Sequence, residues 1–443
     1  MPVYILILFY TILVDYTAGW QIERSHGGRR WWFLVLSIIA NLGVLIVFKY
    51  FNFFNANLTS LASFLHWNYP IQNLAILLPL GLSFHTFQSL SYTIEVYRGR
   101  QKAERHLGIF ALYVMFYPQL VAGPIERPMH LLPQLHHHYT FDYQRVTDGL
   151  RRMVWGFFKK IVIADRLAVI VNMVYNEPSE FSGLTWVLAT YFFAFQIYCD
   201  FSGYSDIAIG AAHVMGYNLS QNFHRPYFAR SISEFWQRWH ISLSTWFRDY
   251  LYIPLGGNRV AQWRWYYNLM IVFLVSGLWH GANWTFIVWG ALHGFYMLGE
   301  IWTSRLRARL AAQLRLDQYP WLYKSLQILL TFHLVAFAWI FFRANSMADA
   351  LYIVKQFTVP AMLQSLPGFA YQVTKTFGEL ELAYCFIFIL LLLGIEGWQS
   401  INQDRPLIQP KPIWLRWALY YAAIFSIMIF GAHNSSQFIY FQF

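Results

Sequence analysis

Residues 265–299 read WYYNLMIVFLVSGLWHGANWTFIVWGALHGFYMLG, an apolar stretch that contains no Asp, Glu, Lys or Arg. As a single helix it would extend about 52 Å at about 1.5 Å per residue. That length far exceeds the roughly 30 Å hydrocarbon core of a bilayer. We therefore predict two helical arms that meet at Gly281-Ala282-Asn283, since glycine and asparagine weaken a helix.

Basic residues flank both open ends of this hairpin, and they place both ends in the cytoplasm by the positive-inside tendency. They are Arg248, Arg259 and Arg264 on one side and Arg305, Arg307 and Arg309 on the other. From Tyr266 to His280 the first arm would rise about 22 Å. His280 is then an ionisable group deep in the membrane, on backbone that lines an enclosed or watery cavity. Such a group is a functional candidate by default.

The composition is that of a polytopic membrane protein. Of 443 residues, 57% are hydrophobic and only 12% are charged, against about 25% charged residues in soluble domains. The net charge of +11 lies in short loops between apolar runs, so it fits membrane topology and anionic headgroups rather than nucleic acid. Cys199 and Cys385 both lie in apolar runs and indicate neither a disulfide framework nor a metal site. The three consecutive imidazoles 136–138 cannot face one ion from a helix or strand, which favours a solvated loop.

Several further spans are expected, among about ten to twelve hydrophobic elements, and the N-terminal run lacks the basic leader of a cleavable signal. The main ones are residues 3–20, 31–48, 74–96, 184–199, 326–342, 382–397 and 414–430. The segment 110–128 is different, because its prolines and glycine exclude a regular helix beyond Tyr117. We expect a broken or re-entrant segment there.

Two polar stretches interrupt the apolar pattern. Asp200 and Asp206 flank a Ser-Gly-Tyr-Ser sequence at 202–205, which we interpret as a break whose carboxylates cap two short helices; the alternative is that they line a polar cavity. The second stretch, 230–252, has amphipathic spacing and a capping box at Ser231 and Glu234. It reads as one interfacial or cavity-lining helix that carries His240 and stops at Pro254.

Five stretches of the chain carry a family resemblance. They are residues 79–92, 118–128, 200–210, 234–257 with Trp-Gln-Arg-Trp-His, and 277–284 with Leu-Trp-His-Gly, and the C-terminal Phe-Ile-Tyr-Phe-Gln-Phe also fits. In these motifs the chain resembles the membrane-bound O-acyltransferase family. Within it, the chain is most similar to the bacterial alginate O-acetyltransferases, with the D-alanyl transferases of teichoic acid as cousins.

The resemblance implies a fold and a catalytic pair. The fold is an all-α ring of about ten to twelve transmembrane, re-entrant and interfacial helices around a central funnel. It would form one membrane domain over 1–443, with a motif core at about 74–300. Relatives usually begin with one or two further N-terminal helices, so the first part of the ring is expected to be incomplete. The family's catalytic histidine corresponds to His280 and its second histidine to His240.

The resemblance also implies a reaction: an acyl group moves from a cytoplasmic thioester across the membrane to the hydroxyls of an exported polysaccharide such as alginate. The donor would be acetyl-CoA or an acyl-carrier protein, with no permanently bound cofactor and no metal. Membrane lipid and a periplasmic SGNH-type acetyltransferase are the expected partners, in the bacterial cytoplasmic membrane. For substrate binding we expect residues of the matching motifs, namely Asn283, Trp279, Trp236, Arg238, Asp200 and Ser202.

The chemistry needs positioning, a base and stabilisation of a developing oxyanion. An imidazole suits the role of base, and we assign it to His280. Asn283 would share its helical face if the helix continued that far. His293 would stand about 20 Å from His280 on a continuous helix, so it is a partner only if the chain turns sharply.

Alternative interpretations remain open from the sequence. His280 could be a structural histidine, and His240 an interfacial residue rather than a donor- or acceptor-positioning one. The acyl group could be D-alanyl, and the acceptor a lipid or protein. A transporter would also have broken helices and polar groups near the midplane, although no related halves are visible.

Overall fold

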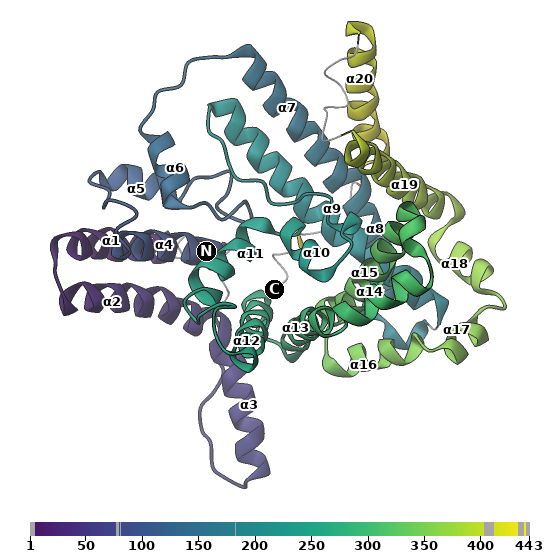
Figure 1. Cartoon of the computed structure of the whole chain (residues 1–443), viewed down its shortest axis with the longest axis horizontal. Helices are drawn as coiled ribbons and strands as arrows, with labels where there is room; N and C mark the ends of the chain where they lie inside the picture. The colour runs from purple at the N-terminus through teal and green to yellow at the C-terminus, as the bar shows by residue number, and fades with distance from the viewer. Residues whose placement is uncertain are drawn as a thin grey trace. The chain divides into compact units, whose positions relative to one another are not determined.

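The computed structural model describes residues 5–76, 79, 81–181, 183–402, 412–432 and 438–439. Regular secondary structure within these ranges is entirely helical (Figure 1). Six helices are long and apolar enough to cross a membrane: α1 Ile5–Arg24, the continuous helix Gly28–Phe64, α9 Leu184–Met215, α15 Pro320–Arg343, α19 Glu379–Ile401 and α20 Ile413–Phe430. The chain is thus an all-α, multi-pass membrane protein, as its composition predicts. The segment 404–411, expected between the last two spans, lies outside the described residues.

The Cα positions divide the chain into two compact units. The first comprises residues 1–151, 208–221 and 281–283, and the second comprises 152–207, 222–280 and 284–443. Each unit is described below by itself.

The first unit is built on α1, α2 (Gly28–Leu45) and α4 (Leu82–Tyr97), which pack side by side (Figure 1). Their interface holds one buried carboxylate, Asp15. It accepts hydrogen bonds from Ser37 Oγ at 2.6 Å and Asn41 Nδ2 at 2.9 Å. Buried polar groups between apolar helices need such partners because no water is available there.

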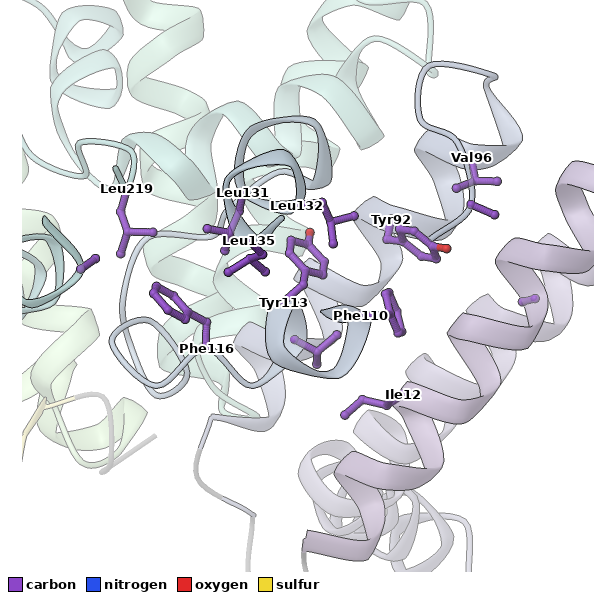
Figure 2. Close-up of a cluster of buried hydrophobic side chains, with 14 of the residues drawn as sticks. Ile12, Tyr92, Val96, Phe110, Tyr113, Phe116, Leu131, Leu132, Leu135 and Leu219 are labelled. Atoms are coloured by element: carbon purple, nitrogen blue, oxygen red, sulfur yellow. The ribbon is translucent and has the colours of Figure 1, made fainter. Parts of the chain in front are cut away.

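An apolar core joins α1 and α4 to α5 (Leu107–Val114) and α6 (Pro128–Leu135). The rings of Tyr92 and Phe110 lie 4.5 Å apart near its centre (Figure 2). Leu219 packs at its edge, from the segment that follows α9. This core fixes the chain on both sides of residues 115–127, which contain no helix. The predicted break beyond Tyr117 is confirmed.

Two predicted spans of this unit have different bounds in the structure. The helix expected at 74–96 begins only at Leu82, because Pro79 precedes it and Gly81 takes a left-handed φ of 75° as its N-cap. The helix expected to end at residue 48 continues instead to Phe64. It passes through a π-helical turn, Ile46–Tyr50, into α3 (Phe51–Phe64).

In the second unit, α9 corrects our interpretation of residues 202–205. The helix is continuous from Leu184 to Met215, so no break occurs and neither aspartate caps a helix end. Gly203 is a packing residue: a Cβ built on it would lie 2.8 Å from the carbonyl oxygen of Gly156, which belongs to α7 (Tyr143–Phe157). The glycine permits a close approach of two helix backbones, as small residues do in membrane proteins.

The amphipathic stretch is also not the single helix that we predicted. It consists of α10 (Ile232–Arg238), α11 (Ile241–Phe247) and a π-helical turn, Arg248–Tyr252, with an interruption at His240. The capping box is present in part, since Ser231 Oγ accepts from the Glu234 N–H at 3.1 Å. As predicted, the helical structure stops before Pro254.

The remaining helices are the α12–α13 hairpin and several shorter helices. The expected hairpin is present as α12 (Gln262–His280) and α13 (Trp284–Trp302), although neither is among the six candidate spans. The others are α8 Asp165–Asn176 after a π-helical turn at Phe158–Ala164, α14 Ser304–Gln313, α16 Met347–Gln356, α17 Val359–Ser365 and α18 Phe369–Phe377.

Candidate functional site

The hairpin of α12 and α13 depends on two glycines that face each other. A Cβ on Gly277 would collide with the backbone oxygen of Phe286, and one on Gly290 with the backbone oxygen of Phe273. Only glycine leaves room for such contact between backbones. Residues 281–283 connect the arms, so the predicted turn is confirmed and His280 is the last residue of its helix.

His280 is enclosed by aromatic rings. Its side chain is buried, and its ring centroid lies 4.8 Å from that of Trp279, 5.0 Å from Trp289 and 5.2 Å from Phe342. Trp289 comes from α13 and Phe342 from α15. Three helices therefore fix this imidazole, although its depth in the membrane stays a prediction.

His240 lies in the interruption between α10 and α11, in a left-handed conformation with φ 43°. Asn222 holds the residues that follow His240 in this geometry. Its carbonyl oxygen accepts from the Ile241 N–H at 2.9 Å, and its Oδ1 accepts from Ser242 Oγ, also at 2.9 Å. A non-glycine residue held in this region costs about 1–3 kcal/mol, and such residues concentrate at functional sites.

One indole links the two histidines. The His240 ring lies 6.1 Å from the ring of Trp279, which in turn lies 4.8 Å from the ring of His280. Phe201 of α9 packs edge-on against His240 at 4.6 Å. The histidines are forty residues apart in the sequence, and the fold brings them to the same aromatic cluster.

Burial sets the protonation of His240. Its side chain is fully enclosed, and desolvation of the charged form lowers its pKa to about 3. The imidazole is consequently neutral at physiological pH. A neutral imidazole can accept a proton at one ring nitrogen and donate a hydrogen bond from the other.

His293 belongs to the same cluster, which the sequence allowed only if the chain turns sharply after His280. Its ring lies 5.0 Å from that of Trp289, the same distance as the ring of His280. The turn at 281–283 folds α13 back along α12, so the two imidazoles flank one indole. Trp236 Nε1 donates to His293 Nδ1 at 3.3 Å, which leaves the proton of a neutral His293 on Nε2.

The expected substrate-binding residues fall into two groups. Trp279 and Trp236 lie in the aromatic cluster. Arg238 does not, because its guanidinium pairs with Glu234 Oε1 at 2.5 Å. Asn283 lies in the turn after α12 has ended, so it does not share a helical face with His280.

Asp200 and Ser202 are held by two neighbouring lysines, of which Lys159 is buried and Lys160 is partly exposed. Lys160 Nζ lies 2.6 Å from Asp200 Oδ1. Lys159 Nζ donates to Ser202 Oγ at 2.9 Å and to Asp206 at 2.7 Å. These residues form a compensated charge network, not the helix caps that we expected.

The C-terminal segment meets this network. The Ile439 N–H donates to Asp200 Oδ2 at 2.8 Å, and both Phe438 and Ile439 are buried. Phe438 packs at 6.0 Å from Phe201, the ring that contacts His240. Residues 438 and 439 of the C-terminal motif thereby lie next to the aromatic cluster.

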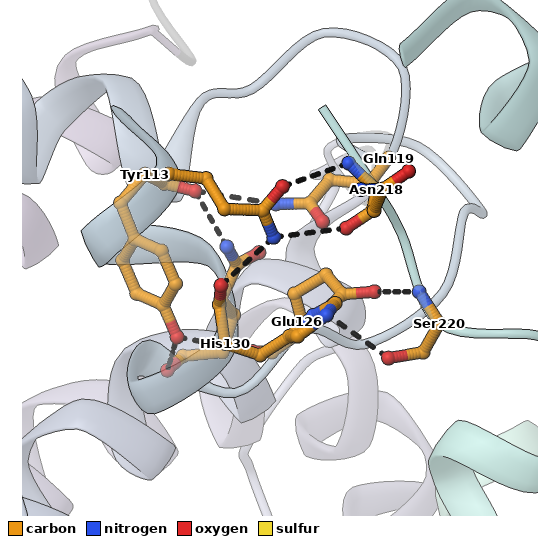
Figure 3. Close-up of polar contacts among 8 residues, drawn as sticks. Tyr113, Gln119, Glu126, His130, Asn218 and Ser220 are labelled. Atoms are coloured by element: carbon orange, nitrogen blue, oxygen red, sulfur yellow. Dashed lines mark hydrogen bonds and ion pairs between the residues drawn. The ribbon is translucent and has the colours of Figure 1, made fainter. Parts of the chain in front are cut away.

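A carboxylate–imidazole pair occurs in the first unit (Figure 3). Glu126 is fully buried, and it accepts from the Ser220 N–H at 2.5 Å and from Ser220 Oγ at 3.2 Å. His130 Nδ1 lies 2.6 Å from the same carboxylate. The hydrogen bond to Glu126 raises the pKa of His130 above its ordinary value, against the opposing effect of burial.

Within the described ranges no group of three or more His, Cys, Asp or Glu side chains could hold a metal ion. In the run 136–138, His136 Nε2 instead lies 2.8 Å from Glu104 Oε2. Cys199 and Cys385 are free and buried.

Sequence reasoning missed His293, Trp289 and Phe342, although one signal was available. A turn of three residues between two apolar arms predicts an antiparallel pair, and this pairing sets His293 beside the first arm. No comparable signal existed for Phe342, which lies 62 residues beyond His280.

Comparisons with known proteins agree with these motifs. A sequence model described as MBOAT, membrane-bound O-acyltransferase family, matches residues 106–342, which include both His240 and His280. The chain is 44% identical over 349 residues to a "Probable alginate O-acetylase" of Azotobacter vinelandii, covering 77% of this chain and 66% of the relative.

Relatives with other acceptors are also similar. A peptidoglycan O-acetyltransferase of Helicobacter pylori is 36% identical, covering 80% of this chain and 69% of the relative. A teichoic acid D-alanyltransferase of Bacillus subtilis is 28% identical, covering 59% of this chain and 68% of the relative. The aligned part of this chain spans 66% of the A. vinelandii protein and 64% of its Pseudomonas aeruginosa counterpart, just under two thirds of either.

Proposed function

Since the chain belongs to the membrane-bound O-acyltransferase family, we propose that it is a membrane O-acetyltransferase that passes an acyl group from a cytoplasmic thioester toward an exported polysaccharide such as alginate. One observation carries this proposal: His240 and His280, far apart in the sequence, converge on Trp279 in a buried aromatic cluster. In this proposal residues 1–443 act as one membrane domain.

His280 is the general base of the proposed reaction. A hydroxyl that attacks a thioester loses its proton as the ester C–O bond forms, and an imidazole with a pKa near neutrality accepts it efficiently. The C–S bond then breaks, and the imidazolium returns the proton to the departing thiolate, which leaves as the free thiol of the donor. The aromatic rings of Trp279, Trp289 and Phe342 fix the ring orientation and exclude water. Both effects favour a single reactive geometry.

His240 has a different role in the proposed reaction: as a neutral imidazole it stabilises the developing oxyanion. A neutral, buried imidazole can donate a hydrogen bond to the oxygen that gains negative charge in the tetrahedral intermediate. Its low pKa supports this role, because the group stays neutral throughout the physiological range. The strained backbone at φ 43° holds it in place.

The donor and the cellular setting follow from the same proposal. Acetyl-CoA and an acyl-carrier protein present the same thioester, and either would reach the protein from the cytoplasm. We propose the bacterial cytoplasmic membrane as the location. An SGNH-type periplasmic acetyltransferase would then be the partner that completes transfer to the polymer.

The test is acetyl transfer by the purified protein reconstituted into vesicles. His280→Ala should lower the rate by at least about 10²–10⁴-fold, the usual contribution of general-base catalysis. His280→Gln should be equally inactive, since it keeps the size and a hydrogen bond but cannot take up a proton near neutral pH. Donor binding should change little in either variant.

A control variant makes the result specific. His333→Gln alters an exposed histidine of α15, and it should leave the rate unchanged. Near wild-type transfer by either His280 variant would show that His280 is structural and that the base lies elsewhere.

D-alanyl transfer is the second candidate, favoured by the similarity to teichoic acid D-alanyltransferases. The two candidates differ in donor, so competition between acetyl and D-alanyl thioesters in the reconstituted assay separates them. Uptake of substrate into vesicles without any acyl donor would instead favour a transporter. Mass spectrometry of envelope polysaccharide with and without the gene identifies the acceptor.

A further inference from the structure

A cavity of about 380 Å³ lies between α13, α14 and α15 in the second unit. This volume is within the range of small-molecule sites, about 300–1,000 Å³. Its lining includes Phe295 and Tyr296 from α13, Leu310 and Ala311 from α14, and Leu330 and Leu334 from α15. Thr303, Gln327 and Thr331 also line it, so the walls are mainly, not wholly, apolar.

The chemistry of these walls decides between two kinds of occupant. The arm of a thioester donor carries amide groups, and each buried amide without a hydrogen-bond partner costs about 1–3 kcal/mol. Gln327 and Thr331 could partner an amide, but the leucines and aromatic rings that make up most of the lining offer none. A hydrocarbon chain needs none, and it gains about 0.8 kcal/mol for each methylene that it buries.

The rim of the cavity is basic. Arg230 and Arg307 line it, together with Glu300. Glu300 is already engaged, because its carboxylate accepts from the Ser233 N–H at 3.1 Å. Arg230 Nε forms an ion pair with Glu234 Oε2 at 3.3 Å. Arg307 Nη2 donates a hydrogen bond to the backbone carbonyl oxygen of Glu300 at 2.8 Å.

Helix α14 (Ser304–Gln313) has the pattern of an interfacial helix. Leu306, Leu310 and Leu314 follow one another at intervals of four residues and are 56%, 46% and 67% exposed. Residues 305–324 contain the cations Arg305, Arg307, Arg309, Arg315 and Lys324 and a single carboxylate, Asp317. Exposed leucines beside arginines favour the boundary between anionic headgroups and acyl chains.

We propose that this cavity binds one acyl chain of an anionic phospholipid, whose phosphate lies against Arg307 and Arg230. The apolar walls take the chain, and the basic rim takes the headgroup. The bound lipid ties α14 to the ends of α13 and α15, where α14 has no buried residue of its own.

The proposed site is distinct from the candidate catalytic cluster. His240, His280 and Trp279 do not line the cavity. One lining residue, Tyr296, touches the cluster: its ring lies 5.8 Å from that of His293. Lipid binding can therefore be measured without any acyl transfer.

The test uses the full-length protein in a non-ionic detergent, titrated with phosphatidylglycerol or phosphatidylcholine. Native mass spectrometry reports the bound lipid, and thermal unfolding reports its effect on stability. We expect a saturable rise in Tm with phosphatidylglycerol and a much weaker one with phosphatidylcholine.

Matched variants locate the site. Ala311→Trp fills the cavity and should abolish the phosphatidylglycerol-dependent rise in Tm, whereas Leu306→Trp, on the same helix but outside the lining, should retain it. Arg307→Gln should weaken the apparent affinity about tenfold, the loss expected for one charge-assisted hydrogen bond. Arg309→Gln, which does not line the cavity, should have little effect.

Three results would overturn the proposal. One is an equal response to both lipids, and another is undiminished phosphatidylglycerol binding by Ala311→Trp. The third is displacement of the lipid by acetyl-CoA in the wild-type protein, which would assign the cavity to the acyl donor.

Discussion

At the scale of single residues, polar side chains that look isolated in the sequence have hydrogen-bond or ion-pair partners in the folded protein. Asp206 shows this most clearly. It binds Lys159 Nζ at 2.7 Å and Arg152 Nε at 2.8 Å, in a segment where the sequence suggested a helix cap. Removing one member of a buried ion pair leaves the other charge without compensation, which typically costs about 3–5 kcal/mol.

Asp206→Asn should therefore destabilise the protein by about 3 kcal/mol, toward the low end of that range because Arg152 is partly exposed. The measurement is the midpoint of thermal unfolding in detergent. The double variant Asp206→Asn with Lys159→Gln should recover part of the loss, because it removes the uncompensated ammonium. A double variant less stable than Asp206→Asn alone would contradict this account.

At the scale of elements, the hairpin of α12 and α13 depends on its glycines. Gly290→Ala would push a methyl group into the backbone oxygen of Phe273, whereas an added Cβ at Gly299, on the same helix, meets nothing within 4 Å. Overpacking of this kind costs about 1–3 kcal/mol. Alanine in place of an unconstrained helical glycine stabilises by about 0.4–1 kcal/mol.

We thus expect Gly290→Ala to lower both the yield of folded protein and acyl transfer, because the hairpin carries His280 and His293. Gly299→Ala should match or exceed the wild-type yield. Size-exclusion chromatography and thermal unfolding of both variants provide the measurement. Equal behaviour of the two would show that the close approach is not required.

The Glu126–His130 pair predicts a pH dependence of the first unit. The pKa of His130 is raised in the folded state, so protonation stabilises the fold. This stabilisation is complete below the unfolded pKa of about 6.5 and is lost as the pH rises through the folded value. His130 is half-exposed, which limits the effect to below about 1 kcal/mol.

The comparison is between the wild type and His130→Gln at about pH 5.5 and about pH 8.5, each chosen about one unit or more from the unfolded pKa. The difference in unfolding midpoint between the two proteins should be larger at the lower pH. A difference that is larger at the higher pH would show that the pair is not stabilised by protonation.

At the scale of the whole molecule, the distribution of basic residues predicts a topology. The loops around Arg100, Arg307 and Lys411 should face the cytoplasm, and Asn57 and Lys375 should face outward. Lys411 lies outside the residues that the structure describes. Single cysteines at these positions, in a background without Cys199 and Cys385, can be labelled with a membrane-impermeant reagent in intact cells. Labelling at 307 or protection at 57 would refute this orientation.

The sequence by itself determined the features that depend on local chemistry. The hairpin turn at 281–283, the broken chain beyond Tyr117 and most of the apolar spans all follow from glycine, proline and unbroken hydrophobicity. Glycine and proline act on the backbone within a few residues, and hydrophobicity sets the free energy of transferring a segment from water to lipid. Both can therefore be judged from the sequence alone. The assignment of His280 and His240 came from the motifs.

Only the tertiary structure decided which residues meet. The sequence suggested a break at Gly203, where the glycine instead lets two helices approach. It left open whether His293 lies near His280, and the hairpin brings both to one cluster. It gave no sign that Phe342 packs on His280 or that Trp279 links the two histidines. Such contacts depend on how helices distant in the chain pack against one another, and side-chain periodicity within one helix does not specify its neighbour.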